Sequence, residues 1–215
     1  MGSHDQETRR RLLEAATRLF AAKGFRRVTV RTICHKAGAN VAAVNYHFGG
    51  KMGLYRQVVL TAIDTMTTTT EVARQAGEGH TADEKLRRYV RVFLERVVAK
   101  SAGSWIHQLM IHEMADPTPV LDLVVDQVIR PRLAYLSGVV ATILETRADD
   151  PRVMQGVMSV QAQCHALMPN PAARRLLGNF HEDPAAIEAM VTHIAEFSLG
   201  GLRTLKTRGL EVLRS

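Results

Sequence analysis

The sequence predicts an all-α protein in which a small N-terminal domain precedes a larger helical domain. Apolar residues recur at three- and four-residue steps along the 215-residue chain, and no alternating strand pattern stands out. Capping residues, glycines and prolines interrupt this periodicity at intervals typical of helices. Basic residues are concentrated in the first quarter of the chain. We expect one domain at residues 1–50 and a second at residues 51–215.

Four helices are expected in the first 76 residues. Side chains of Thr, Asp and Asn accept a hydrogen bond from a free N–H group at a helix start, and glycine ends helices because it adopts the left-handed conformation easily. Val28 and Ile33 also have the spacing of a hydrophobic staple around a cap at Thr29. The expected boundaries are, in order, Asp5 to Lys23-Gly24, Thr29 to Ala37-Gly38, Asn40 to His47, and Lys51 to Ala76.

Prolines and a loop at residues 77–80 divide the rest of the chain. Proline is favoured in the first turn of a helix but disrupts its interior, so Pro131 should kink or split the helix that contains it. Gly103 precedes an apolar segment that contains Trp105 and Leu109. The expected helices are Glu84–Ser101 with a cap at Thr81 or Asp83, one that follows Asp116-Pro117-Thr118-Pro119, one from Asp150-Pro151 to Met168, and one from Asp183-Pro184 to Arg208.

The charge distribution indicates a polyanion-binding module at the N-terminus. Residues 1–58 contain 11 Lys and Arg and three acids, a local net charge of +8. The rest of the chain has 17 bases and 18 acids, so the overall excess of +7 lies entirely in the first part. A local basic excess is typical of nucleic-acid binding, although a solvated basic surface would give the same pattern.

Residues 29–48 have the form of a helix-turn-helix, in which the second helix lies in the DNA major groove. Ala42 and Ala43 are small enough for close approach to base edges, and Asn45 can pair with adenine through two hydrogen bonds. Val41, Val44 and Phe48 share a side of this helix that can pack inward. His47 and Lys51 lie where phosphates would run, and Lys51 opens a helix whose N–H groups attract phosphate.

Short motifs across residues 8–60 resemble the TetR family of repressors, with matching spacing and residue type over four helices. They are Leu12-Leu13-Glu14-Ala15-Ala16, Leu19-Phe20, Lys23-Gly24-Phe25, Thr29-Val30-Arg31-Thr32-Ile33, Ala37-Gly38 and Val44-Asn45-Tyr46-His47-Phe48-Gly49-Gly50-Lys51. Later motifs are similar to the CecR (YbiH-type) subgroup: Asn45-Tyr46-His47-Phe48, His112-Glu113-Met114, Pro117-Thr118-Pro119 and Arg130-Pro131-Arg132-Leu133. Most TetR-like proteins have tyrosine at the position of Asn45, so the family's base preference does not transfer there.

The resemblance implies a repressor that binds a palindromic double-stranded DNA operator as a homodimer and is released by a small-molecule effector. It also implies that Arg31 reaches a base, that residues 41–45 face base edges, and that Tyr46, His47 and Lys51 hold phosphates. The expected DNA-binding residues are Thr29, Arg31, Asn40, Val41, Ala42, Ala43, Asn45, Tyr46, His47 and Lys51.

The segment after residue 50 is too long and too neutral for DNA contact alone, so we expect it to bind the effector and make the dimer. Methionines and aromatic residues either pack the core or line a pocket. The expected pocket residues are Phe93, Trp105, Met110, Met114, Met154, Met158 and His165. Phe180 has the same ambiguity.

Apolar stripes on the last two long helices suggest a four-helix dimer interface. Gly200-Gly201 is costly within a helix, which suggests a close backbone approach by a partner. The alternative is that the stripe at 184–208 packs within its own subunit. The expected interface residues are Val153, Val157, Val160, Cys164, Ile187, Met190, Val191, Ile194, Ser198, Gly201, Leu202 and Leu205.

Other functions have weaker support in the sequence. Gly49-Gly50-Lys51 lacks the spacing of a phosphate-binding loop, and no arrangement of catalytic residues stands out, so neither an enzyme nor a cofactor is expected. His107 and His112 are five residues apart, a poor spacing for one helical face. With Glu113 and Cys164-His165, however, a metal-responsive repressor is an alternative that the sequence leaves open.

The distant cysteines, and the lack of a signal peptide or long apolar run, indicate a cytoplasmic protein.

Overall fold

The structure is a computed structural model that describes residues 3–98, 105–168, 175–176, 178 and 182–212. Within these ranges the regular elements are helices and no strand occurs, as the sequence predicts. The chain divides into two compact units. Unit 1 comprises residues 1–66 and 103–128, and unit 2 comprises residues 67–102 and 129–215. No helix in the described ranges is long and apolar enough to cross a membrane.

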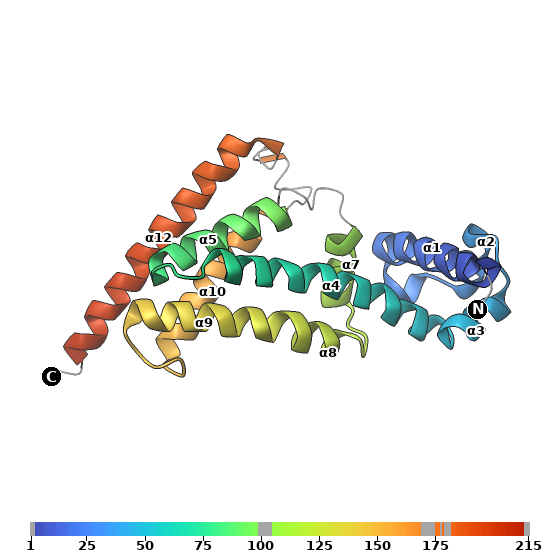
Figure 1. The fold of residues 1–215 in the computed structure, drawn as a ribbon, viewed down its shortest axis with the longest axis horizontal. Coiled ribbons are helices and arrows are strands. Elements are labelled where there is room, and N and C mark those ends of the chain that lie inside the picture. The colour runs from blue at the N-terminus through green and yellow to red at the C-terminus, as the bar shows by residue number, and fades with distance from the viewer. Residues whose placement is uncertain (1–2, 99–104, 169–174, 177, 179–181, 213–215) are drawn as a thin grey trace. The chain divides into compact units, whose positions relative to one another are not determined.

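Unit 1 contains the N-terminal helices and a segment from the middle of the chain (Figure 1). Helix α7 packs along α1. The compact units therefore do not meet at the expected boundary, residue 50, because the buried Leu54, Tyr55 and Val58 extend the core of unit 1 into α4. The elements are α1 (Ser3–Arg27), α2 (Val30–Ala37), α3 (Val41–Phe48), the first part of α4 (Lys51–Ala76), α7 (Trp105–Ala115), α8 (Leu121–Val124) and the π-helical turn η2 (Val125–Ile129).

Local hydrogen bonds explain why α2 and α3 begin and end where the sequence predicts. The Thr29 hydroxyl accepts a hydrogen bond from the Thr32 N–H at 3.1 Å, and the Asn40 side chain accepts one from the Ala43 N–H at 2.8 Å. Gly38 ends α2 with a φ of 60°. These caps confirm the two short helices of the helix-turn-helix.

The first helix differs from the prediction at both ends. It begins at Ser3, so Asp5 lies within its first turn and does not cap it. At Gly24 the backbone leaves the helical conformation, with φ 74° and ψ 168°, and residues 25–27 form a further turn. The predicted stop at Gly24 is therefore present as a sharp break within α1.

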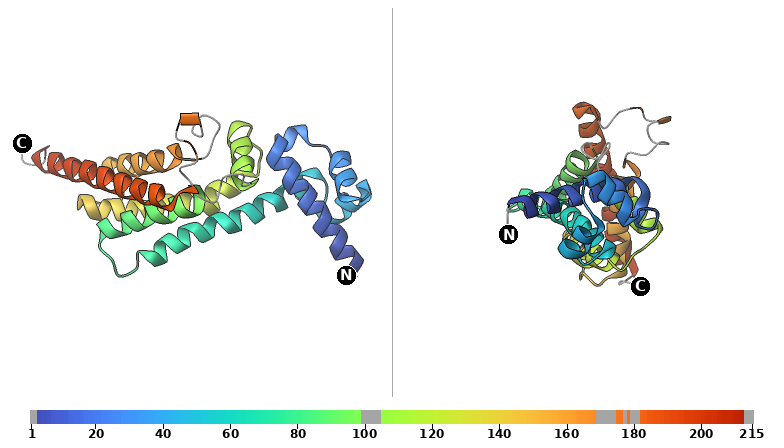
Figure 2. Two further views of the ribbon diagram at one scale, coloured as in Figure 1. Left: turned by 90° about the horizontal axis from the view of Figure 1, so that it is seen from above. Right: turned by 90° about the vertical axis from the view of Figure 1, so that its right-hand side faces the viewer.

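Unit 2 is a bundle of longer helices (Figure 2). Thr81 caps α5 in a reciprocal arrangement with Glu84, which decides between the two expected caps. Pro131 was expected to kink or split its helix, but helical conformation continues without a break from α8 into α9. The disturbance takes the form of the π-helical turn η2, which directly precedes Arg130 and Pro131. The elements are the second part of α4, α5 (Ala82–Phe93), the π-helical turn η1 (Leu94–Val98), α9 (Arg130–Leu144), α10 (Pro151–Ala166) and α12 (Pro184–Val212).

The core of unit 2 lies where α5, α9, α10 and α12 face one another. Gly156 permits the close packing of α10, since a Cβ atom there would lie 2.6 Å from Leu202 and 3.0 Å from Val140. Ion pairs join α5 to α12 at the surface, among them Arg87 with Glu196 and Arg91 with Glu188.

Candidate nucleic-acid interface

Helix α3 presents a polar and small-residue face to solvent. Tyr46 is 75% exposed, and Asn40, Ala42 and Asn45 are exposed as well. Val44 is fully buried and anchors the helix to the rest of unit 1. The hydrogen-bonding groups of these side chains are therefore accessible on one face of a helix, and the DNA major groove is wide enough to admit an α-helix.

Val41 differs from the expectation that it packs inward. It is 44% exposed as the first residue of α3, although it shares a helical side with the buried Val44. Its exposure is compatible with its other expected role, an apolar contact to a base edge. Ala43 is half-buried on the same helix.

Thr29 and Arg31 lie at the start of α2, and both are exposed. The Thr29 hydroxyl is engaged in capping and also lies 2.8 Å from the Thr32 hydroxyl. Within the part of the chain that the structure describes, no carboxylate pairs with Arg31, and the residue is exposed to solvent.

His47 lies on the inner side of α3, which differs from the expected phosphate contact. Its side chain is only 3% exposed, and Nε2 lies 3.4 Å from the Asp5 carboxylate. The His47 ring also lies edge-on to the Tyr46 ring, with the two ring centres 4.9 Å apart. Since the position is near the C-terminal end of α3, the side chain turns toward α1. His47 thus contacts Asp5 of α1, and its buried side chain is not presented to solvent as a phosphate contact would require.

Lys51 is the first residue of α4 and is held over an aromatic ring. Its Nζ atom lies 4.2 Å from the centre of the Phe25 ring, and partial burial lowers the pKa of the ammonium group. Phe25 in turn contacts Phe20 and Tyr55, with ring centres 6.0 and 4.9 Å away. The cation is thus placed by packing, and no carboxylate among the described residues pairs with it.

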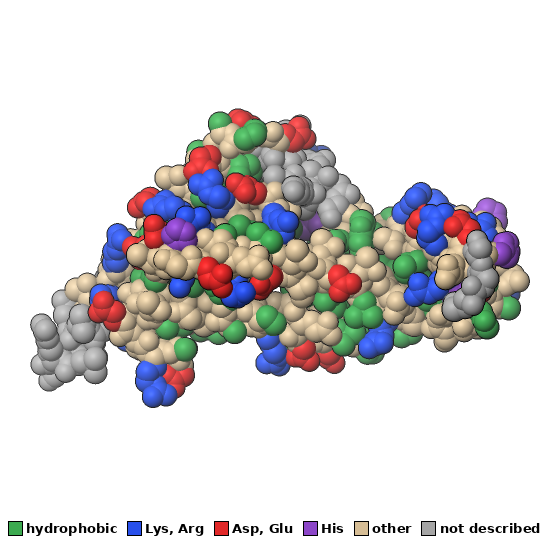
Figure 3. All heavy atoms as spheres, in the orientation of Figure 1, with side chains coloured by type: hydrophobic (Ala, Val, Ile, Leu, Met, Phe, Trp, Pro, Cys, Tyr) green, Lys and Arg blue, Asp and Glu red, His purple; other side chains and the backbone are tan. Residues whose placement is uncertain are grey.

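The structure also shows which bases of the N-terminal excess are already neutralised. Arg10 pairs with Glu7 and Glu14, and Arg26 pairs with Asp116 at 2.8 Å. Lys, Arg and His side chains gather over α1–α3 on the face in Figure 3, together with some acids. Lys36 on α2 and Arg56 on α4 are also exposed cations, and the sequence analysis did not include them among the DNA-binding residues. In the sequence they contribute only to the basic excess of residues 1–58.

Two of the expected pocket residues come together in unit 2. The rings of Phe93 and His165 are 5.1 Å apart, and burial lowers the pKa of His165. The Arg132 guanidinium lies over the Phe93 ring at 5.9 Å. Gln161 donates a hydrogen bond to the Tyr89 hydroxyl at 2.9 Å, while its buried Oε1 atom has no hydrogen-bond partner among the residues that the structure describes.

The other expected pocket residues do not join this cluster. Met154 and Met158 are 46% and 55% exposed on α10. Trp105, Met110 and Met114 belong to unit 1, where Met114 is 50% exposed. Phe180 lies outside the described residues. Tyr89, Arg132 and Gln161 were missed because their positions are separated along the sequence and meet only through α5, α9 and α10.

Most residues of the stripes expected to form a four-helix dimer interface are buried within unit 2 of the single chain. The facing helices α5 and α9 already cover these sides of α10 and α12, the alternative that the sequence left open. The buried residues are Val153, Val157, Val160, Cys164, Ile187, Val191, Ile194, Ser198 and Leu202. Met190 and Leu205 are partly buried against the same core, and only Gly201 is exposed.

A different face of α10 and α12 is open to solvent. Phe197 is 68% exposed, and its ring stacks on that of His193 at 6.0 Å. Cβ atoms built on Gly200 and Gly201 would have no neighbour within 4 Å. The two glycines therefore serve no close approach to the described parts of this chain.

The histidines considered as metal ligands have other surroundings. In the described ranges, no group of three or more His, Cys, Asp and Glu side chains is close enough to hold a metal ion. Glu113 instead accepts hydrogen bonds from Tyr55 and Thr118.

Comparisons with known proteins agree with this architecture. Residues 12–58 match the model of the TetR family of bacterial regulatory proteins. Residues 82–202, more than half of the chain, match the C-terminal domain of the HTH-type transcriptional dual regulator CecR. A probable HTH-type transcriptional regulator of Bacillus subtilis, YttP, is 34% identical over 83 residues, 39% of this chain and 40% of that protein. SrpR of Pseudomonas putida is 39% identical over 54 residues, a quarter of each chain.

Solved structures share the fold over nearly the whole chain. A putative transcriptional regulator from Pseudomonas aeruginosa covers 97% of this chain and 95% of its own, with a TM-score of 0.67 and 19% identity. The TetR-family regulator SCO4454 from Streptomyces coelicolor covers 92% and 96%, with a TM-score of 0.60 and 23% identity. With the matched models and the exposed recognition helix, the chain belongs to the TetR family of bacterial transcriptional regulators and carries a C-terminal domain of the CecR type.

Proposed function

We propose that this regulator is a repressor that binds a palindromic operator as a homodimer in the cytoplasm and leaves it when a small-molecule effector binds. The observation that carries the proposal is the exposed face of α3, with Asn45 and Tyr46 free above the buried anchor Val44. Its test is selection of DNA from a random pool. A repeated, palindromic consensus supports the proposal, and unselective binding contradicts it.

The DNA contacts divide into two classes. Arg31 and Asn45, with the apolar side chains of residues 41–43, would read base edges. Tyr46 and Lys51 would contact phosphates, while Thr29 and Asn40 lie beside them as exposed caps. Three to four phosphate contacts per subunit would give a dimer a slope of log affinity against log salt of about −5 to −7. A slope near zero for the selected DNA would contradict this division.

The dimer would use the open face of α10 and α12. Met154, Met158 and Phe197 are large apolar side chains exposed on these two helices, and Gly200-Gly201 leaves room for a partner backbone. Two recognition helices must be held about 34–36 Å apart to read neighbouring half-sites. A second copy paired across this face would supply that spacing.

Two substitutions on α12 test the interface. Phe197→Glu should give a folded monomer in sedimentation, because it places a charge in the proposed contact. Ile194→Asp should unfold unit 2, because Ile194 is 1% exposed in the core and its replacement is a buried unpaired charge. A Phe197→Glu protein that sediments as a dimer would place the interface elsewhere.

The effector would bind beside Phe93 and His165. No carboxylate among the described residues pairs with Arg132, so it offers a charge to an anionic group, and Gln161 Oε1 offers an acceptor. We expect a planar anion to bind there. Thermal shifts with a panel of aromatic carboxylates and their neutral amides test this: Arg132→Met should abolish any shift that the carboxylates cause, while the exposed Arg147→Met should leave it unchanged. An equal shift with the amides would contradict an anion site.

A further inference from the structure

Glu113 is a buried acid whose bonds join separate parts of unit 1. The residue is 1% exposed on α7. One carboxyl oxygen accepts a hydrogen bond from the Tyr55 hydroxyl at 2.5 Å. The other accepts bonds from the N–H and the hydroxyl of Thr118 at 2.9 and 2.8 Å. Burying an acid is costly unless it is fully hydrogen-bonded, so these bonds must form together for α7 to pack here.

The partners of Glu113 connect the turn after α7 with the DNA-binding helices. The Thr118 hydroxyl also accepts a hydrogen bond from the Val120 N–H at 3.2 Å, which orders the chain before α8. Tyr55 is fully buried, and its ring lies edge-on to the Phe20 ring of α1, with the ring centres 4.9 Å apart. The same ring contacts Phe25, over which Lys51 lies. A continuous set of contacts therefore runs from Thr118 to the cation that opens α4.

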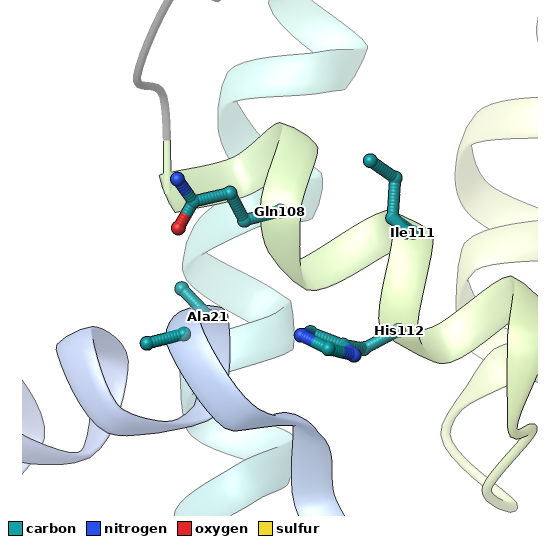
Figure 4. Close-up of a pocket in the computed structure, with 5 residues that line it drawn as sticks. Ala21, Gln108, Ile111 and His112 are labelled. Atoms are coloured by element: carbon teal, nitrogen blue, oxygen red, sulfur yellow. The ribbon is translucent and has the colours of Figure 1, made fainter. Parts of the chain in front are cut away.

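The neighbouring residue fastens α7 to α1. A Cβ atom on Gly24 would lie 3.2 Å from the His112 ring, so this ring packs against the break in α1. Figure 4 shows His112 directed from α7 toward α1, beside a shallow groove lined by Ala21, Gln108 and Ile111. Consecutive side chains of α7 thus hold two different helices, since His112 contacts α1 and Glu113 bonds to α4.

The path of the chain makes these contacts relevant to regulation. The chain passes between the units at residues 66–67, 102–103 and 128–129. Tyr55 precedes the first passage, while Glu113 and Thr118 lie between the second and the third. Glu113 and Thr118 therefore belong to the stretch of unit 1 that these two later passages bound, and their bonds join this stretch to Tyr55 on α4.

We propose that Tyr55, Glu113 and Thr118 form a clasp that positions the DNA-binding helices and provides a route, besides α4 itself, by which changes in unit 2 reach them. The inference rests on the proposed repressor function and names its regulation. When the clasp is closed, α7 supports Tyr55, and Tyr55 supports the aromatic cluster under Lys51. When α7 is displaced, the Tyr55 hydroxyl loses its acceptor and the cluster is free to shift. The three side chains are positioning residues and touch no DNA.

Tyr55→Phe tests the clasp because it removes the hydroxyl and keeps the ring stack. Tyr135→Phe is the matched control, since its hydroxyl donates to the Ala73 carbonyl in unit 2 at 3.3 Å. In the full chain, amides of residues 105–124 and of α1 should exchange hydrogen about tenfold faster in Tyr55→Phe, as expected for loss of a buried hydrogen bond to a carboxyl group. Tyr135→Phe should leave these amides unchanged.

DNA binding supplies a readout that general destabilisation would not give. Affinity for the sequence that the wild-type chain selects from a random pool should fall about tenfold in Tyr55→Phe, while affinity for unselected DNA stays the same because no charge is lost. Thr118→Val removes a second hydroxyl and should change exchange and binding in the same direction. If Tyr55→Phe does not fold, Thr118→Val decides by the same criteria.

The clasp would be overturned by unchanged exchange at residues 105–124, or by faster exchange there with wild-type affinity for the selected DNA. An equal loss of affinity for both DNAs would also overturn it, because a positioning role affects the specific complex alone. If the wild-type chain selects no DNA, the proposed repressor function fails. The exchange measurement would then still decide whether the three side chains join α7 to α1 and α4.

Discussion

Replacing Gly53 with alanine should disturb the junction of α3 and α4, and with it the DNA-binding surface. A Cβ atom on Gly53 would lie 1.8 Å from the main-chain oxygen of Phe48, whereas real Cβ contacts essentially never fall below 3.0 Å. The backbone must therefore move by roughly 1.2 Å, the difference between these distances. Because the opposing atom belongs to the main chain, no side-chain rotation relieves the overlap.

The change in the free energy of unfolding caused by Gly53→Ala is the balance of two opposing effects. Overpacking costs about 1–3 kcal/mol, and an overlap with a backbone atom belongs at the upper end. Alanine in place of glycine within a helix recovers about 1 kcal/mol. The net loss of about 2 kcal/mol should lower the melting temperature by about 4–8 °C in a chain of this length. Operator affinity should fall at least about tenfold, because 1.4 kcal/mol of misplaced contacts suffices for that factor.

Gly138→Ala is the matched control for Gly53→Ala. It lies within α9, where an added Cβ atom has no neighbour within 4 Å. This substitution should raise stability by up to about 1 kcal/mol and leave DNA binding unchanged. Thermal unfolding by circular dichroism and fluorescence anisotropy with the selected DNA measure both effects. If Gly53→Ala melts and binds as Gly138→Ala does, the argument from the tight junction is wrong.

Three further predictions concern DNA contact, packing and pH. Asn45→Ala should make the free energy of operator binding less favourable by roughly 1–3 kcal/mol and relax the base preference at one position. Lys51→Met should weaken binding to all sequences alike and make the slope of log affinity against log salt shallower by about 1 per subunit. DNA selection and salt titration on each variant test this, and a changed base preference in Lys51→Met but not in Asn45→Ala would contradict it. Gly156→Ala should destabilise unit 2, because its Cβ would lie 2.6 Å from Leu202, and a wild-type melting temperature would contradict this. Burial lowers the pKa of His165 from 6.5, so the unfolded chain binds the proton more tightly and stability should fall as the pH decreases through 6.5. His165→Gln should remove this part of the pH dependence of unfolding, and an unchanged pH profile would contradict it.

Local signals in the sequence were sufficient for the helix-turn-helix. Thr29, Asn40 and Gly38 determine helix ends through hydrogen bonds within a few residues, and those bonds form as expected. The exposed face of α3 follows from the same helical spacing. His47 differs because its environment depends on Asp5, which lies on another helix and is distant in sequence. Periodicity does not report such a contact.

The contribution of residues 103–128 to unit 1 could not be derived from spacing. Glu113 was considered as a metal ligand because acidic and histidine residues in a short segment resemble a ligand set. Its role depends on Tyr55, 58 positions earlier, whose hydroxyl reaches the carboxyl group only after α7 packs beside α4. The same reasoning applies to Gln161 and Tyr89, which lie 72 positions apart.

The stripes on α10 and α12 show what amphipathic periodicity does and does not determine. A stripe at three- and four-residue steps indicates that one face of a helix is buried, but it is silent about which surface covers that face. Here Ile194 and Val157 meet α5 and α9 of the same chain, since the core of unit 2 needs both helices to close. The pair Gly200-Gly201 and the exposed Phe197 have no such cover within the described chain. An exposed aromatic residue beside small residues costs solvation and helix propensity with no gain in the monomer. The proposed dimer would therefore use the side of α12 that carries Phe197, next to the edge of the predicted stripe at Gly201, four residues further along the helix.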